Sequence, residues 1–415
     1  MSFSIANTAL NAHTEQLNTI SNNIANSATK GFKASRTEFS SMYAQSQPLG
    51  VAVSGVSQNI SKDGQKEKTG MGLDLAISGG GFFVVRESSG DKAYTRAGMF
   101  RSDVDGYLVN GQGMKLQGYP ADAAGNIQAG IISDLKINNA GVPAKASEQL
   151  DFMANLNASV TAPSVSVFNP TNEKSYNFTT TSTVYDSLGR EHAVAHYFVK
   201  STTPPAGSVA SEWAVHHTVD GGTATPPLTL QFTDTGALIP GIPAAGSGMK
   251  GSAINLHGTF NPAGAADYDI DIDIDYTGTT QLSQGFTTTR NKSDGYTSGV
   301  KNAERIESDG SVYATFSNGE RVLQGKVVLA NFASPSGLVT QNGTSWSESN
   351  KSGAALLGTP GTGLLGSLES GALENSNVDI TAELVGLMTA QRNYQASTKI
   401  ISTNDSMMNA LFQVL

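Results

Sequence analysis

The chain has no cysteine among its 415 residues. It can therefore form neither a disulfide framework nor a thiolate metal site, and it has no cysteine nucleophile. Charge is also scarce, because Asp, Glu, Lys and Arg make up only 15% of the residues and leave a formal net charge of -9. Without a basic domain to displace counterions, we expect no nucleic-acid partner. No apolar run approaches the roughly 20 residues of a membrane span, so we expect no membrane insertion.

The N-terminal segment lacks the features of a secretory signal peptide. Its first basic residue is Lys30, and no compact apolar segment follows. Two interpretations remain open at this stage. The chain is either cytoplasmic or exported by a route that reads an uncleaved, unfolded N-terminus.

Glycine and the small polar residues Ser, Thr and Asn make up much of the uncharged part of the sequence. The hydrophobic fraction of 38% does not count the 45 glycines, so enough apolar material is present for packed cores. A surface rich in Ser, Thr and Asn suits extracellular structural proteins without being specific to them. The length predicts two or three domains.

Both ends carry a seven-residue apolar repeat, and almost nothing between them does. The N-terminal repeat is Phe3, Leu10, Leu17 and Ile24, with Ala6, His13 and Ile20 at the alternate spacing. The C-terminal repeat is Ile380, Leu387, Tyr394, Ile401, Met408 and Leu415, and Leu384 lies between its first two members. Such repeats are typical of helices that wrap around one another. We predict terminal helices whose apolar seams form a polymerisation interface.

Each terminal helix is expected to need a partner. The first contains many Asn and Thr residues, which are weak helix formers, and should be marginal in water without packing. The two ends should therefore fold against each other and against neighbouring subunits. A simpler alternative stays open, in which one intramolecular helix pair closes a single domain.

Between the helices the sequence predicts short β-strands. Gly31 is expected to end the first helix, and residues 31–70 to form an extended, loosely ordered connector. Asp-Gly and Asn-Gly pairs at 105–106, 110–111, 309–310 and 318–319 mark hairpin turns. Ser376 with Asp379 predicts a capping-box start for the last helix.

The strands divide into two groups with different composition. Residues 151–283 contain Pro-rich breaks and Thr-rich strands at 176–184 and 191–200, and we interpret them as an inserted outer β domain. The remaining strands, 71–150 and 284–370, form a β-rich middle domain. With helices at 1–30 and 371–415, the predicted fold is mainly β with terminal α-helices. Nested β domains then lie between helices that form coiled coils.

No motif indicates a reaction. Two glycine sets match a dinucleotide fingerprint, but neither follows a strand and opens a helix: Gly246, Gly248 and Gly251, and Gly361, Gly363 and Gly366. His192 and His196 would share a strand face but lack a third metal ligand. Alternating carboxylates predict a solvated strand face rather than a calcium loop: Asp267, Asp269, Asp271, Asp273 and Asp275. We therefore expect no catalytic residue, no metal, no cofactor and no enzymatic activity.

Several sequence blocks form a recognisable set. The signature near the first helix consists of Asn22, Asn23, Ile24, Ala25, Asn26, Gly31, Phe32 and Lys33. Further blocks lie at 73–83, 94–119, 328–332, 371–379 and 390–395, and residues 184–189 anchor the insertion. Together these blocks are specific, and they cover 1–120 and 285–415. They resemble the axial proteins of the bacterial flagellum, the rod and hook family, and most of all its hook members.

The resemblance implies a structural subunit of the flagellar hook. Such subunits polymerise into a curved, flexible tube that acts as a universal joint and transmits motor torque to the filament. The implied partners are further copies of the chain, the flagellar rod, hook-cap and hook–filament junction proteins, and the flagellar type III export apparatus. The implied location is extracellular, at the hook and basal body, after export without a cleaved signal peptide.

Three alternatives remain. A distal-rod-like axial subunit would share the two ends, although rod subunits lack so large an insertion. A secreted surface adhesin with oligomerising helices should show a repeat array or an adhesive site, and neither is visible. An enzyme would need its site in the insertion, for example a metal site around His192 and His196.

Overall fold

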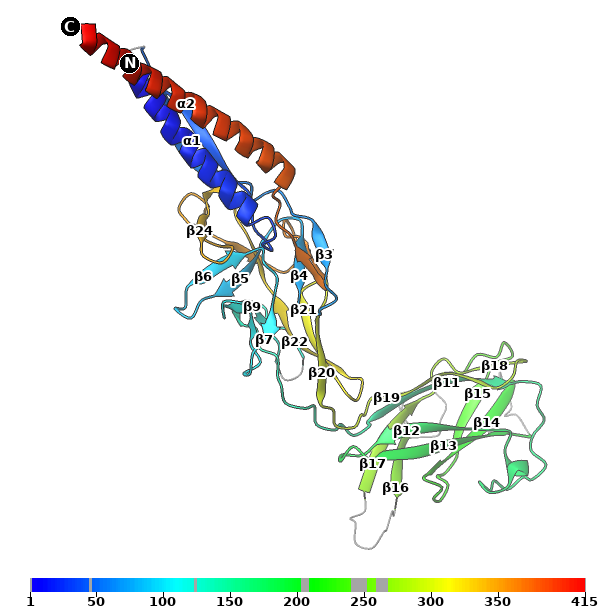
Figure 1. Ribbon diagram of the computed structural model, residues 1–415. Helices are drawn as coiled ribbons and strands as arrows, with labels where there is room; N and C mark the ends of the chain where they lie inside the picture. The colour runs from blue at the N-terminus through cyan, green and yellow to red at the C-terminus, as the bar shows by residue number, and fades with distance from the viewer. Residues whose placement is uncertain are drawn as a thin grey trace. The chain divides into compact units, whose positions relative to one another are not determined.

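The computed structural model describes residues 2–44, 47–122, 125–202, 209–239, 252–258 and 268–414. Contacts divide the chain into two compact units. Unit 1 consists of residues 1–139, 302–315 and 321–415, and unit 2 of residues 140–301 and 316–320. The predicted fold class is confirmed, because the chain is mainly β with a helix at each end (Figure 1).

Helices α1 (Ser2–Ala25) and α2 (Ile380–Val414) lie side by side and antiparallel in unit 1, the blue and red ribbons of Figure 1. The prediction that the first helix continues to Gly31 is wrong. The Asn26 amide donates hydrogen bonds to Asn22 O and Oδ1, at 3.0 and 2.9 Å, and turns follow from there. Gly31 has a different role, since its φ is +71° and a Cβ there would lie 2.5 Å from Ala97 N.

The predicted start of the last helix is also corrected. Asp379 is the N-cap, because its Oδ1 accepts the N–H groups of Thr381 and Ala382 at 3.0 and 3.1 Å. Ser376 lies outside the helix, and its Oγ accepts the N–H of Val378 at 3.3 Å.

The segment expected to be a loose connector contains ordered strands. Strands β1 (Ser35–Ala44) and β2 (Gln47–Gln58) form an antiparallel hairpin whose β2 strand packs along α1. Its register shifts at Glu38/Phe39 and at Met42/Tyr43. These shifts interrupt the apolar alternation by which a strand is normally detected.

The β body of unit 1 is one thirteen-stranded sheet, with the central order β20-β21-β22-β9-β5-β6-β25-β24. Its strands are β5 (Phe82–Arg86), β6 (Lys92–Thr95), β7 (Arg101–Ser102), β8 (Leu108–Val109), β9 (Lys115–Pro120), β10 (Ser133–Asp134), β20 (Lys301–Ile306), β21 (Ser311–Phe316), β22 (Arg321–Val327), β23 (Leu329–Asn331), β24 (Val339–Gln341), β25 (Ser345–Ser347) and β26 (Leu356–Gly358). A short 3-10 helix covers Pro335–Gly337. In its core, Phe82 packs edge-on against Trp346 and Phe332, with ring centroids 5.6 and 5.8 Å apart.

Most of the expected turns are present. Gly106, Gly310 and Gly319 all have positive φ angles, as the Asp-Gly and Asn-Gly pairs predict. One turn differs, because Gly113 rather than Gly111 has the positive φ. The Asn110 side chain fixes this loop by accepting the N–H groups of Gln112 and Met114, each at 3.0 Å.

Two short strand pairs bring the C-terminal part of the chain back to the N-terminal part. Strand β27 (Ser367–Ser370) pairs with β4 (Leu75–Ser78), and β28 (Ala372–Glu374) pairs with β3 (Lys66–Lys68). The root of α2 is thereby held next to the segment that follows α1.

Unit 2 contains two sheets that enclose one core. The first has the order β16-β17-β11-β18 with β19 also on β11, and the second the order β12-β13-β14-β15. Their bounds are β11 (Gln149–Asn157), β12 (Phe178–Tyr185), β13 (Glu191–Lys200), β14 (Ser211–Val219), β15 (Leu228–Phe232), β16 (Ser252–Gly258), β17 (Tyr268–Asp275), β18 (Thr280–Leu282) and β19 (Thr287–Ser293). A 3-10 helix covers Glu173–Ser175. Phe152, Phe198, Trp213 and Phe232 are fully buried between the sheets. The unit is wider at both ends than the predicted insertion, 151–283.

No helix in the described part of the chain has the length and apolar character needed to cross a membrane.

Candidate assembly site

The helix pair is where the sequence predicts an interface. Among the residues predicted for it, Ile20 is buried, and six others are half-buried: Leu10, Leu17, Ile24, Leu387, Tyr394 and Ile401. The side chain of Phe3 and all of Leu415 lie outside the described residues. Apart from Asn23, the most buried positions of the pair are small residues, of which the repeat includes only the first: Ala6, Ala12, Ala390 and Ser397. Small side chains let two helices approach closely.

Two of the predicted residues, Ile380 and Leu384, are exposed rather than buried in the helix pair. Met388, which the prediction does not include, continues their spacing of four residues. We call these three residues the α2 stripe, and they are 49%, 46% and 53% exposed in chain order. Residues four apart on a helix lie on one face, so the stripe is a continuous apolar strip. An apolar strip of this kind indicates a surface that binds another protein.

The seam of α2 also continues past the end of α1. Helix α2 has 35 residues and α1 has 24, and Figure 1 shows the C-terminal end of α2 extending beyond the start of α1. Met408, which continues the seven-residue repeat there, is 47% exposed. The seam is therefore longer than its partner within the chain.

Gly386 lies inside α2 with room for a larger side chain. A Cβ at this position would meet only Ile20 Cδ1, at an ordinary 3.5 Å. Because glycine in a helix interior is about 1 kcal/mol less favourable than alanine, Gly386→Ala should stabilise unit 1 by about that amount. Urea unfolding followed by Trp346 fluorescence checks this. A loss of stability would show that the two helices lie closer together than described.

A buried charge cluster holds the root of α2 to the segment that follows α1. Glu374 accepts hydrogen bonds from Lys33 Nζ at 2.7 Å and from the Gly64 N–H at 2.9 Å. Its second oxygen lies 3.2 Å from Arg96, which also contacts Asp63 at 3.3 Å. The Lys33 and Glu374 side chains are 0% and 1% exposed. Burial lowers the pKa of the Lys33 ammonium, and Glu374 partly offsets this effect.

Several signature residues act as side-chain hydrogen-bonding groups at the same place. The buried Asn23 amide bonds both backbone groups of Ser35, at 2.7 and 2.9 Å, and donates to Glu383 of α2 at 3.0 Å. Asn377 plays the matching part from the other end of the chain. It accepts the Ala34 N–H at 2.7 Å and donates to Asn59 O and Lys62 O, each at 2.9 Å.

Other signature residues end α1 or form single backbone hydrogen bonds. Asn22 and Asn26 terminate α1, Gly31 donates its N–H to Glu374 O at 2.8 Å, and the Phe32 carbonyl accepts the Asn377 N–H at 3.4 Å. Ile24 is half-buried in the helix pair and Ala25 is exposed. The sequence does not predict the charge cluster, because its members lie far apart in the chain. A charged residue among uncharged neighbours, such as Arg96 two positions after Tyr94, is the one signal that the sequence offers for it.

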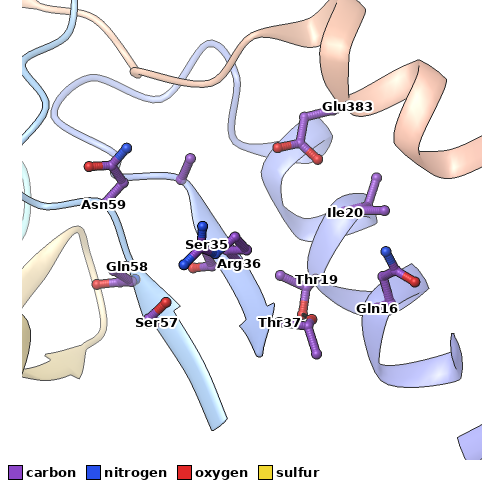
Figure 2. Close-up of a pocket in the computed structure, with 11 residues that line it drawn as sticks. Gln16, Thr19, Ile20, Ser35, Arg36, Thr37, Ser57, Gln58, Asn59 and Glu383 are labelled. Carbon is purple, nitrogen blue, oxygen red and sulfur yellow. Dashed lines mark hydrogen bonds between the residues drawn. The ribbon is translucent and has the colours of Figure 1, made fainter. Parts of the chain in front are cut away.

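A polar groove of about 460 Å³ lies between α1 and the hairpin. Figure 2 shows Gln16, Thr19 and Ile20 of α1 facing residues of β1 and β2, with Glu383 of α2 at one end. Thr37 donates a hydrogen bond to Thr19 across it at 2.9 Å. The residues that line this groove do not form a recognisable catalytic arrangement.

The weak motifs do not form binding sites within the described residues. Residues 361–366 form a turn between β26 and β27 and open no helix. Gly246, Gly248, Gly251 and Asp267 lie outside the described residues, as do the side chains of Asp269 and Asp271. His192 contacts Asp220 at 2.8 Å, whereas His196 is in the core of unit 2. In the described part of the chain no group of three His, Cys, Asp or Glu side chains could hold a metal ion.

Comparison with family models covers most of the chain. Four models match: "Flagella basal body rod protein" at 3–33, "Flagellar hook protein FlgE/F/G D1 domain" at 76–148, "Flagellar basal body protein FlaE D2 domain" at 155–296 and "Flagellar basal body rod FlgEFG protein C-terminal" at 369–414. A solved structure, the flagellar hook protein FlgE2 of Helicobacter pylori, has a TM-score of 0.52 and 16% identity. It covers 74% of this chain and 99% of its own, and it supports the fold.

Curated relatives match along the full length. The flagellar hook protein FlgE of Salmonella typhimurium is 40% identical over 420 residues, and that of Escherichia coli K12 is 39% identical over 418 residues, each covering 99% of both chains. The hook protein of Borreliella burgdorferi is 30% identical over 444 residues, covering 98% of this chain and 97% of its own. Identity at this level along the whole length shows that the chain belongs to the flagellar hook protein family.

Proposed function

We propose that the chain is a structural subunit of the bacterial flagellar hook and that it has no catalytic role. Its relatives bear the hook protein name over their full length. The observation that carries the proposal is the helix pair, which leaves the α2 stripe exposed and the α2 seam longer than its partner. Both features need another chain to cover them.

A tube requires contacts that do not close into a ring. A helical polymer arises when a patch on one subunit binds a different patch on the next. The α2 stripe and the overhanging seam around Met408 are distinct surfaces of one helix. We propose that the helix pairs form the inner layer of the tube, with the seam residues Leu387, Tyr394, Ile401 and Met408 in the interface. The β domains then lie outside and adjust as the tube bends, as a universal joint for motor torque requires.

The proposed partners follow from the same assignment. Further copies of the chain are the main partner, and the rod, the hook cap and the hook–filament junction supply its ends. Export through the flagellar type III apparatus, without a cleaved signal peptide, would place the subunit outside the cell at the hook.

A charge placed on the α2 stripe separates folding from polymerisation. Met388 is 53% exposed, so Met388→Asp should leave the unfolding free energy of the monomer within about 1 kcal/mol of the parent. In the polymer the carboxylate would be buried without a partner, at a cost of several kcal/mol, so sedimentable polymer should be lost.

Val104→Asp is the matched control. Val104 is an apolar residue of the same unit, 95% exposed and far from either helix in sequence. This variant should polymerise normally. Normal polymers from Met388→Asp would remove the α2 stripe from the interface.

A further inference from the structure

Unit 2 has an unusual core, because two histidines are buried in it. His196 of β13 and His217 of β14 are each 0% exposed, and they lie opposite each other in the strand register. Their rings are 5.0 Å apart. Phe152 of β11 stacks on His196 at 4.7 Å, so apolar and aromatic groups surround the pair.

One hydroxyl joins the two rings. The Tyr276 hydroxyl lies 2.9 Å from His196 Nδ1 and 2.7 Å from His217 Nε2. On the far side of His196, Nε2 lies 2.8 Å from Ser182 Oγ. These atoms form a single line of hydrogen bonds from β14 to β12. The last nitrogen of the line, His217 Nδ1, is buried without a partner among the described residues.

The hydrogen count limits the line to two directions. Tyr276 has one proton, so it donates to one ring and accepts from the other. In the first direction His217 Nε2–H donates to Tyr276, Tyr276 donates to His196 Nδ1, and His196 Nε2–H donates to Ser182. The lone pair of His217 Nδ1 is then left over, and the hydroxyl hydrogen of Ser182 rotates out of the line. The reverse direction would leave the N–H of His217 Nδ1 fixed in the core without an acceptor. Because a hydroxyl hydrogen can rotate and a ring N–H cannot, the count favours the first direction, in which both rings are neutral Nε2–H tautomers.

Among the side chains that the structure describes, no charged group faces the pair to stabilise an added proton. The groups that face it are Phe152, Ser182 and Tyr276, and His216 lies on the opposite face of β14. The carboxylates of Asp186 and Asp220 contact His192, four positions away along β13. Asp220 is 2.8 Å from His192 Nδ1. A proton added to the pair would thus be a buried, unpaired charge.

We propose that this line of buried histidines is an acid-triggered unfolding switch of unit 2, in which His217 Nδ1 is the site that acidification cannot fill without opening the core. The proposal stands on unit 2 alone and does not depend on the proposed function.

The direction of the pH effect follows from burial. Burial lowers the pKa of His196 from 6.5 to about 3. The pKa of His217 is also well below 6.5, because of burial and then because of His196 and His216. The unfolded chain therefore takes up protons that the folded unit cannot. Stability is full above pH 6.5 and falls as the pH drops from 6.5 towards about 3.

The two tryptophans let each unit of the full-length chain be followed separately. Trp213 lies in unit 2 and Trp346 in unit 1, so Trp346→Phe and Trp213→Phe each leave one reporter. Below pH 6.5 the unfolding constant of unit 2 should rise roughly tenfold per pH unit for each histidine, and about a hundredfold for both.

The test is urea unfolding of the Trp346→Phe chain at about pH 7.5 and about pH 5, with and without His217→Gln. Gln keeps an N–H donor for Tyr276 and does not titrate. The unfolding constant of unit 2 should therefore rise about tenfold per pH unit in this variant, instead of about a hundredfold. His216→Gln, on the outer face of the same strand, should keep most of the dependence. An unchanged dependence in His217→Gln overturns the proposal. If His217→Gln does not fold, the acid response of Trp213 in the Trp346→Phe chain is compared with that of Trp346 in the Trp213→Phe chain. A larger acid response of Trp213 than of Trp346 supports the switch, and an equal response overturns it.

Discussion

Replacing Glu374 by glutamine should destabilise unit 1 by about 3–5 kcal/mol, the usual cost of breaking a buried ion pair from one side. The Glu374 side chain is 1% exposed and neutralises Lys33 and Arg96 together. Without it, Asp63 is the remaining carboxylate among the described residues that acts on both Lys33 and Arg96, and its side chain is 40% exposed. Because Glu374 ends β28, the last strand before α2 begins at Ile380, the variant should also loosen the helix pair.

Glu369→Gln is the control for removing a charge. Glu369 lies in the neighbouring strand β27, where its contact with Lys66 is 3.4 Å long and the two side chains are 41% and 27% exposed. This change should cost less than about 1 kcal/mol. Urea unfolding of the Trp213→Phe chain, followed by Trp346, measures both. A Glu374→Gln cost as small as that of Glu369→Gln would mean that the cluster is hydrated rather than buried.

Removing unit 2 should leave a chain that still polymerises, but with an altered curvature. The chain leaves and re-enters unit 1 through neighbouring backbone, because the Val142 N–H donates to Gly299 O at 2.9 Å. Paired residues of this kind are about 5 Å apart, so a Gly/Ser linker of about four residues can replace 140–301. The residues of the thirteen-stranded sheet and both helices remain, apart from Lys301 at the start of β20.

The polymer of the shortened chain tests the role assigned to unit 2. Straighter or more variable tubes in electron micrographs are expected, since outer contacts bias a tube towards one curved form. Tubes of unchanged curvature would show that unit 2 does not set the shape. An insoluble chain would show that these boundaries cut through a folded unit.

Much of the fold was predictable because its signals are local. Asp309-Gly310 and Asn318-Gly319 predicted turns that are present, and the Thr-rich segments predicted β12 and β13 nearly to the residue. The seven-residue repeats predicted α1 and α2. Their pairing within the chain is seen, so the simpler helix-pair alternative describes part of the structure. A helix pair within one chain does not explain why the α2 stripe is exposed or why α2 extends past the start of α1.

The errors have identifiable causes. The sequence predicts a loose connector where the hairpin β1–β2 lies, because the register shifts of its strands hide the apolar alternation and because the hairpin packs on α1, a contact with no local sequence pattern. The edges of unit 2 lie further out than 151–283, at 140 and 301. The segments on either side of 151–283 pair with each other, as Val142 does with Gly299, and a pairing between residues so far apart in the chain leaves no trace in the local composition.

The candidate site was predictable only in part. The apolar repeat identified residues such as Ile20, Leu387 and Ile401, but the closest packing involves Ala390 and Ser397. Lys33, Arg96 and Glu374 meet only after folding, because 278 residues separate Arg96 from Glu374. Long-range pairing of this kind leaves no local pattern in the sequence.

We propose that the two terminal helices build the polymer. Electron cryomicroscopy of tubes assembled from the purified full-length chain tests this proposal directly. We expect an inner layer made of α1 and α2 from every subunit, with Leu384, Met388 and Met408 buried against neighbouring copies. Tubes in which these three side chains face solvent, or in which neighbouring subunits touch only through unit 2, would contradict it.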